Sequence, residues 1–161
     1  MTACPMNSFN SCTGMTKFFN IGHCWHGANS FGGCTNLKYW IGINAYDFYG
    51  GVFNGCTSLL AIDTLQFQTR AASVCQNCSK LSTLIIRSST VTSTLYNINV
   101  FTGTPFADGK AGGTLYVPQA LITSYQSATN WSTILGYANN QILPIEGSIY
   151  ETQYADSTPI I

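Results

Sequence analysis

Apolar side chains recur at a fixed interval of 22 residues over the first half of the chain. One cysteine marks each interval, and an apolar or sulfur-containing residue stands three positions before it, three after it and six after it. The four columns are Phe9, Phe31, Phe53 and Cys75; Cys12, Cys34, Cys56 and Cys78; Met15, Leu37, Leu59 and Leu81; and Phe18, Trp40, Ile62 and Leu84. A fixed period in the twenties is typical of a solenoid, in which each coil buries its apolar face against its neighbours.

Within one period, the spacing of three predicts a short helical turn, Phe-x-x-Cys-x-x-Leu, that leads into an extended segment. We expect strands at Lys17–Ile21, Tyr39–Ile43, Ala61–Leu65 and Thr83–Arg87, the last of which has the best strand composition. Stacked one per coil, these strands would form a parallel sheet. The pattern therefore predicts a β-rich, leucine-rich-repeat-like solenoid with short helical turns.

The period ends after Arg87. We expect a further strand around Val91–Ile98, a turn-rich loop over Phe101–Gly113 and a strand at Thr114–Val117. Apolar spacing then predicts a helix from about Pro118 to Ala128, and Asn130–Ser132 opens a second short helix.

These segments suggest one domain over residues 1–146, with repeats at about 7–101 and a helical C-terminal cap at 114–146. A cap is expected because the last coil of a solenoid has an open apolar end. Residues 147–161 are expected to form an extended tail, either mobile or docked on a partner.

Composition narrows the function. Only 7% of the residues are Asp, Glu, Lys or Arg, and the formal net charge is zero, so we expect no nucleic-acid partner. No apolar run is long enough to predict membrane insertion. The N-terminus lacks the pattern of a secretory signal, so an extracellular role would need a removed leader, a larger parent chain or a phage-type assembly route. Near-zero charge favours association, which predicts a homo-oligomer or virion neighbours.

Two clusters resemble reactive sites. Cys75 and Cys78 form a C-x-x-C pair, but both stand in buried columns, so we interpret them as small apolar residues. The thiol of Cys24 lies between His23 and His26, and we interpret that segment as a connecting loop that packs Trp25 rather than as a metal site.

Seven cysteines is an odd number, and stacked thiols point in parallel, so we expect no disulfide within the cysteine column. Cys4 and Cys24 fall outside the columns and are expected to be the exposed or reactive thiols. The acidic residues are scattered. We therefore expect no cofactor, no metal ion, no catalytic residues and no enzymatic activity.

The strands also predict a binding face. If Phe18, Trp40, Ile62 and Leu84 point inward, strand alternation turns six neighbours outward. These candidate binding residues are Lys17, Phe19, Tyr39, Ile41, Asp63 and Ile85. An exposed apolar strip of this kind would mark an interface with a glycan, a protein or a sister subunit.

The repeated Phe-x-Gly-Cys-Thr-x-Leu motif, followed by a strand, resembles the BspA-type leucine-rich repeats. The segment Thr-Leu-Tyr-Val-Pro-Gln-Ala-Leu-Ile-Thr-Ser-Tyr-Gln-Ser-Ala-Thr-Asn-Trp-Ser, which begins at Thr114, is similar to the ending that closes such arrays in gut bacteria and their phages. The resemblance covers roughly residues 7–146 and implies extracellular, non-catalytic binding. It carries no catalytic residue over to this chain.

Three hypotheses follow. The first is a recognition or adhesion module on a cell surface or virion that binds a cell-surface protein or glycan. The alternative is a structural subunit of a phage particle, in the tail or decorating the capsid. The third, which we favour least, is a thiol- or metal-dependent enzyme.

Overall fold

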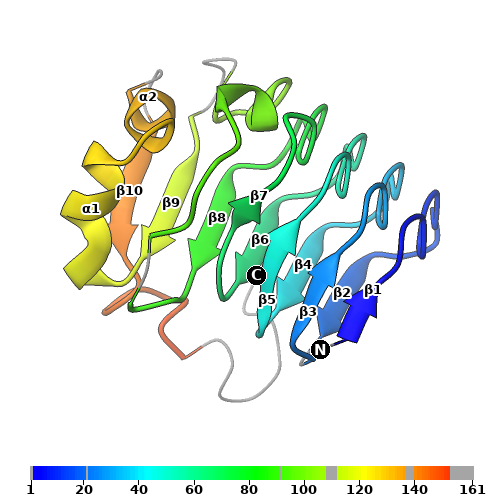
Figure 1. Ribbon diagram of the computed structural model, residues 1–161, viewed down its shortest axis with the longest axis horizontal. Helices are drawn as coiled ribbons and strands as arrows, with labels where there is room; N and C mark the ends of the chain where they lie inside the picture. The colour runs from blue at the N-terminus through cyan, green and yellow to red at the C-terminus, as the bar shows by residue number, and fades with distance from the viewer. Residues whose placement is uncertain (1, 21, 91, 108–111, 137–139, 153–161) are drawn as a thin grey trace.

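The chain winds into a parallel β-solenoid in which each of the first four coils adds one strand to each of two facing sheets (Figure 1). The computed structural model describes residues 2–20, 22–90, 92–107, 112–136 and 140–152. The long sheet consists of β2 (Lys17–Asn20), β4 (Tyr39–Gly42), β6 (Ala61–Thr64), β8 (Thr83–Ile86), β9 (Thr114–Val117) and β10 (Gln141–Pro144). The short sheet consists of β1 (Thr2–Cys4), β3 (Cys24–His26), β5 (Ala45–Phe48) and β7 (Gln68–Thr69). The predicted solenoid is therefore confirmed.

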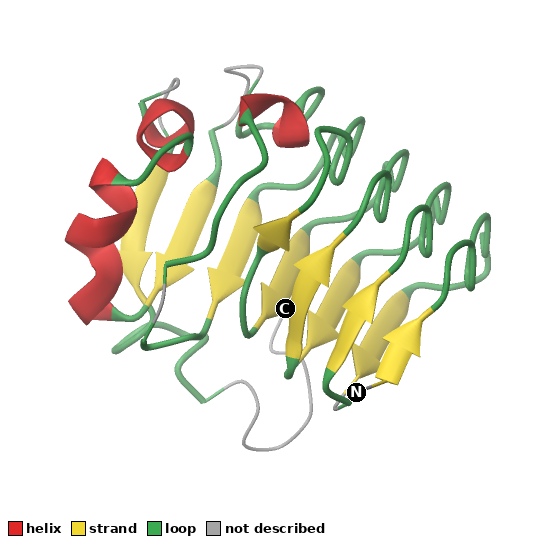
Figure 2. Cartoon of the chain, in the orientation of Figure 1, coloured by secondary structure: helices red, strands yellow, loops and turns green. Residues whose placement is uncertain are grey.

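The long sheet keeps the 22-residue register that the sequence predicts. Lys17 pairs with Tyr39, Tyr39 with Ala61, and Ala61 with Thr83. The first four predicted strands agree with β2, β4, β6 and β8 to within one residue at their C-terminal ends, although Ile21 lies outside the described residues. The strands of the two sheets run in opposite directions around each coil (Figure 2).

The core fills the space between the sheets with the four predicted columns. Phe31, Cys34, Leu37 and Trp40 are fully buried, as are the equivalent residues of the next two coils. Aromatic rings stack from coil to coil, with centroids 5.2 Å apart for Phe9 and Phe31 and 5.8 Å apart for Phe31 and Phe53. Each coil therefore buries its apolar side chains mainly against the equivalent residues of the neighbouring coils.

The helical turns are joined by a backbone ladder of their own. The amides of Phe31 and Phe53 donate to the carbonyls of Val52 and Val74, at 2.9 and 2.8 Å. Two positions of each of the first three turns adopt positive φ, which glycine and asparagine tolerate best. One of these columns consists of Ser11, Gly33, Gly55 and Asn77.

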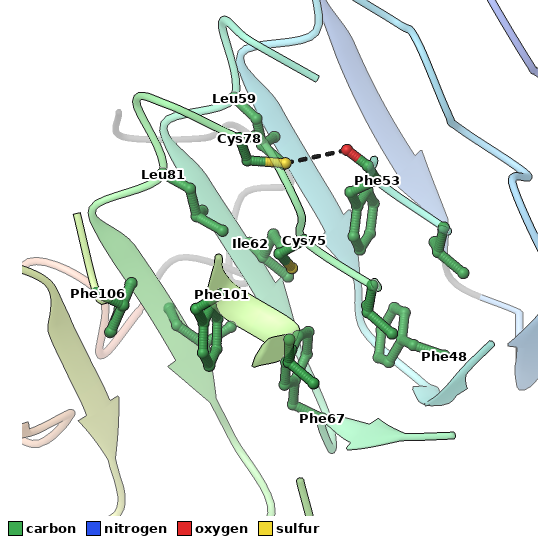
Figure 3. Close-up of a cluster of buried hydrophobic side chains, with 14 of the residues drawn as sticks. Phe48, Phe53, Leu59, Ile62, Phe67, Cys75, Cys78, Leu81, Phe101 and Phe106 are labelled. Carbon is green, nitrogen blue, oxygen red and sulfur yellow. Dashed lines mark hydrogen bonds between the residues drawn. The ribbon is translucent and has the colours of Figure 1, made fainter. Parts of the chain in front are cut away.

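Each buried cysteine of the cysteine column links its coil to the preceding one. The thiols of Cys34, Cys56 and Cys78 donate to the carbonyls of Phe9, Phe31 and Phe53, at 3.0 Å in all three cases. Figure 3 shows the bond from Cys78 to Phe53. Every cysteine of the chain is a free thiol. The 22-residue spacing of the cysteines thus reflects a repeated S–H···O bond between coils.

The C-terminal end of the stack is covered by short helices (Figure 1). They are η2 (Gln119–Leu121), α1 (Ile122–Ser127) and α2 (Trp131–Leu135), whereas η1 (Ile98–Phe101) continues the row of turns. Tyr125 of α1 and Trp131 of α2 are fully buried in the core. Both bind the backbone of Ser93: its amide donates to the Tyr125 hydroxyl at 2.9 Å, and Trp131 Nε1 donates to its carbonyl at 2.7 Å.

One expectation for this half of the chain is wrong. The segment 92–97 forms no strand: the amide and carbonyl of Ser93 bond to Tyr125 and Trp131, while the Thr94 carbonyl accepts the amide of Thr69 in β7. Val91 lies outside the described residues. Gln141–Pro144, for which the sequence predicted no strand, is a strand that pairs with β9. No described helix has the length and apolar character needed to cross a membrane.

Candidate functional site

The predicted binding face on the long sheet is only partly exposed. Lys17 is exposed, Tyr39 is half-buried and the Phe19 side chain is 41% exposed. Its three other members point away from the core but are buried: Ile41 is 2% exposed, and Asp63 and Ile85 are fully buried. The prediction of exposure is therefore wrong for Ile41, Asp63 and Ile85.

Part of the cover over this face comes from the C-terminal segment, which folds back onto the outer side of the long sheet. Ile145 and Tyr150 form a second apolar cluster with Ile85, and Tyr116 packs against it. The rings of Tyr116 and Tyr150 are 4.7 Å apart, and burial raises the pKa of Tyr150. Within the predicted tail, Tyr150 thus packs on the sheet, whereas the part from residue 153 lies outside the described residues.

The buried part of the face also contains an ion pair. Nε and Nη2 of Arg87 donate to the two carboxylate oxygens of Asp63, both at 2.7 Å. This bidentate geometry gives both oxygens of the fully buried Asp63 carboxylate a hydrogen-bond donor. Asp63 therefore has a structural role at the coil boundary between β6 and β8.

The remaining exposed patch of the long sheet is small. It joins Phe19 to Lys17, whose ammonium lies 5.8 Å from the centroid of the Tyr39 ring. This distance allows a cation–π attraction that holds the two side chains together. Of the six predicted residues, the structure leaves Lys17, Phe19 and Tyr39 as a possible contact surface.

A second, partly exposed surface lies on the outer side of the short sheet, where the sequence had suggested a connecting loop. We name it the short-sheet face, and it is formed by three adjacent coils. Its residues are Trp25 on β3, Tyr46 and Asp47 on β5, Tyr49 directly after β5, Gln68 on β7 and Arg70 directly after β7. Their inward neighbours Ala45, Phe48 and Phe67 are fully buried.

Aromatic rings occupy the N-terminal part of the short-sheet face. Trp25 and Tyr49 meet edge to face with ring centroids 5.4 Å apart, and His23 lies 4.8 Å from Tyr46. The Tyr49 side chain is 40% exposed. Two aromatic pairs, Trp25–Tyr49 and His23–Tyr46, therefore make up the aromatic platform of this face.

Polar groups continue the short-sheet face toward the C-terminus. Arg70 donates to the Asp47 carboxylate at 2.8 Å, and this hydrogen bond raises the pKa of Arg70. Gln68 donates to the side-chain carbonyl of Gln66 at 3.2 Å. The surface therefore offers planar carboxylate, guanidinium and amide groups beside aromatic rings.

The sequence held a weak signal for the short sheet. Cys24-Trp25-His26 alternates inward, outward, inward, as a strand should. In the next coil two outward residues, Tyr46 and Asp47, separate the inward Ala45 and Phe48, because the pairing of β3 with β5 contains a register shift. The shift hides the alternation, so the segments do not resemble one another.

The candidate reactive thiols are mostly buried. Cys24 was expected to be exposed but points into the core, where burial raises its pKa. Cys75 and Cys78 are fully buried, and burial raises the pKa of both thiols well above the usual value. Among the described residues, no three His, Cys, Asp or Glu side chains are placed to hold a metal ion.

The His26 side chain is fully buried against aromatic rings. Its ring lies 4.9 Å from that of Trp40 and 5.6 Å from that of Phe48. Nε2 lies 3.5 Å from the sulfur of Cys24, whereas Nδ1 has no hydrogen-bond partner among the described residues. Burial lowers the pKa of His26 to about 4, so the ring is neutral at pH 7.

The fold places the chain in the class of parallel β-solenoids, and its short-sheet face carries aromatic pairs beside an ion pair. No protein-family model, curated protein or solved structure matches the chain.

Proposed function

We propose that the protein is a non-enzymatic recognition or adhesion module that binds a cell-surface protein or glycan through the short-sheet face. The observation that carries the proposal is the platform of Trp25, Tyr46 and Tyr49 beside the Asp47–Arg70 pair. The platform replaces the long-sheet strip as the main binding surface, because the C-terminal segment covers part of that strip.

The chemistry of the short-sheet face suits such ligands. Tyr, Trp and Arg contribute most to binding energy at protein interfaces, because large, stiff side chains lose little entropy on contact. Aromatic rings also stack on the C–H faces of sugars, while carboxylate and amide groups bind their hydroxyls. Strands of neighbouring coils are about 4.8 Å apart, so the face presents a regular surface to an extended ligand.

The resemblance to BspA-type repeats supports an extracellular location, at a cell surface or on a virion. The near absence of charge on the chain supports the alternative of a structural subunit in a phage particle, because little electrostatic repulsion opposes close packing. Both versions require the short-sheet face to be accessible in the assembled protein.

The test is binding of the fluorescently labelled chain to a glycan array and to intact bacterial and animal cells. We expect Tyr49→Ala and Arg70→Ala each to weaken binding about tenfold or more, as loss of a hot-spot contact does. Phe19→Ala, which removes an exposed aromatic ring from the long sheet, is the matched control and should bind normally. Treating the cells with glycosidase or protease separates a glycan ligand from a protein ligand.

Thermal melts of the variants show whether lost binding reflects lost folding, and unchanged melting temperatures are expected for these exposed sites. Normal binding by both Tyr49→Ala and Arg70→Ala, or lost binding by Phe19→Ala alone, would exclude the short-sheet face as the site.

A further inference from the structure

We propose that the N-terminal end of the solenoid is an interface at which a second copy of this chain docks end to end. The end is formed by β1 and β2, which are the outermost strands of their sheets (Figure 1). The opposite end is covered by α1 and α2, so pairing through the N-terminal ends would stop at a dimer.

The first observation is an incomplete core. In the first coil Phe9, Cys12, Met15 and Phe18 are all only partly buried, although they occupy the core columns. Their counterparts one coil later are fully buried. The first coil thus lacks, among the described residues, the layer that every following coil receives from its predecessor.

The second observation is a cavity at this end. It has a volume of about 400 Å³, and its lining includes Cys4, Phe9, Phe18, Asn20, Cys24 and His26. His26 borders the cavity, and its buried Nδ1 is without a partner among the described residues. An apolar layer placed over the end would close this cavity and complete the core.

The third observation concerns the strand edges. The carbonyls of Thr16 and Asn20 accept hydrogen bonds from Lys38 and Ile43 in the next coil. Because backbone direction alternates along a strand, the amides of Lys17 and Phe19 face the open edge of β2. Unpaired edge amides and carbonyls are a template for pairing with another strand.

These features together indicate which partner binds the N-terminal end. The partner must present two strand edges as far apart as the two sheets of this solenoid, with apolar side chains between them. The same end of another copy does this. A two-fold axis between the copies makes the facing strands antiparallel, because the strands of the two sheets run in opposite directions (Figure 2).

Charge does not oppose this contact. Between residues 1 and 37 the only Asp, Glu, Lys or Arg is Lys17. Edge strands that avoid association usually carry several charges or are covered. A nearly uncharged end can therefore face an identical end with little repulsion or desolvation of charge.

The test is the mass of the full chain by light scattering and analytical ultracentrifugation over a range of concentrations. We expect a reversible dimer and no larger species. Phe19→Pro removes the edge-facing amide of β2 and should raise the dimer dissociation constant about tenfold or more, whereas Phe19→Ala keeps the amide and should leave it unchanged.

A second pair of variants decides the matter if Phe19→Pro loses its fold by circular dichroism. Ser8→Glu places a carboxylate at the rim of the N-terminal cavity and should also weaken the dimer; Thr57→Glu places one on an exposed turn of a middle coil and should not. A monomer at every concentration would overturn the proposal and assign the end to another protein or chain segment. A dimer unaffected by Ser8→Glu would place the contact elsewhere. Neither result would affect the short-sheet face.

Discussion

Cys34, Cys56 and Cys78 are hydrogen-bond donors inside an apolar core. The carbonyl of each repeat phenylalanine already accepts the amide of the cysteine in its own coil, and the thiol of the next coil supplies a second donor. Valine could fill similar space but would leave that second lone pair of the carbonyl unused. The thiol therefore combines apolar packing with a weak donor.

Substitutions of Cys56 test this role. Cys56→Ala should lower the free energy of unfolding by about 1–2 kcal/mol, because both the bond and packing volume are lost. Cys56→Ser keeps a donor within reach of the Phe31 carbonyl, which accepts the thiol at 3.0 Å, and should be less harmful than Cys56→Val. Urea unfolding measures the three values. A valine variant as stable as the parent would show that the sulfur only fills space.

His26 predicts a pH-dependent stability. Its pKa in the folded state is about 4, against 6.5 for a free histidine. The unfolded chain therefore binds a proton first, so the stability is complete above pH 6.5 and falls as the pH is lowered to 4. At 1.36 kcal/mol per pKa unit, the loss is about 3 kcal/mol.

Urea unfolding between pH 7 and pH 4 measures this loss. In His26→Phe the histidine-dependent part of the slope should disappear, whereas His23→Ala, which changes an exposed histidine, should keep it. The same slope in His26→Phe and in the parent chain would assign the pH dependence to other groups.

At the scale of elements, the helical turns depend on positive φ at repeated positions. Gly55 has φ of 75°, and a Cβ there would meet no atom closer than 3.9 Å. The glycine is thus required by backbone conformation and not by space. Asn77 adopts the same conformation one coil later, with φ of 62°.

Gly55→Ala should therefore lower the unfolding free energy by about 1–2 kcal/mol, the cost of a left-handed conformation. Gly55→Asn should cost less, because asparagine tolerates this region. Gly14→Ala, at an open position without positive φ, should have almost no effect. Thermal denaturation compares the three, and equal losses for alanine and asparagine would point to crowding instead.

The elements also show how far the sequence could predict the structure. The columns to which Phe31, Cys34 and Leu37 belong predict the long sheet, because equivalent residues of adjacent coils pack against each other. The short sheet was missed because the register shift at Tyr46 and Asp47 breaks its alternation. The strand expected around Val91–Ile98 is interrupted at Ser93, whose amide and carbonyl bond to Tyr125 and Trp131, residues distant in sequence, although Thr94 still accepts a hydrogen bond from β7.

The candidate site was predicted less well for a related reason. Strand alternation correctly turned Ile41, Asp63 and Ile85 outward, but outward is not the same as exposed. Ile145 and Tyr150 pack over Ile85 after the chain returns from the cap. No local pattern encodes such a long-range return, so the exposed part of the long-sheet face was overestimated.

For the whole molecule, the two sheets differ in how strictly they hold their register. In the long sheet Ala61 pairs with Thr83, which is 22 residues later, but Thr83 pairs with Thr114, which is 31 residues later. The additional residues lie outside the long sheet, in the irregular segment after β8 and in the turns that precede β9. The long sheet therefore continues unbroken while the coil between its strands lengthens.

This difference gives the scaffold room for diversification. A loop that grows on the short-sheet side of a coil leaves the neighbouring coils in register, whereas one extra residue inside β4 or β6 would turn core side chains outward. Related chains should therefore vary in length on the side that carries Trp25, Tyr49 and Arg70. A library of loops inserted next to Trp25, Tyr49 and Arg70 would change the contact surface while the two sheets keep their structure.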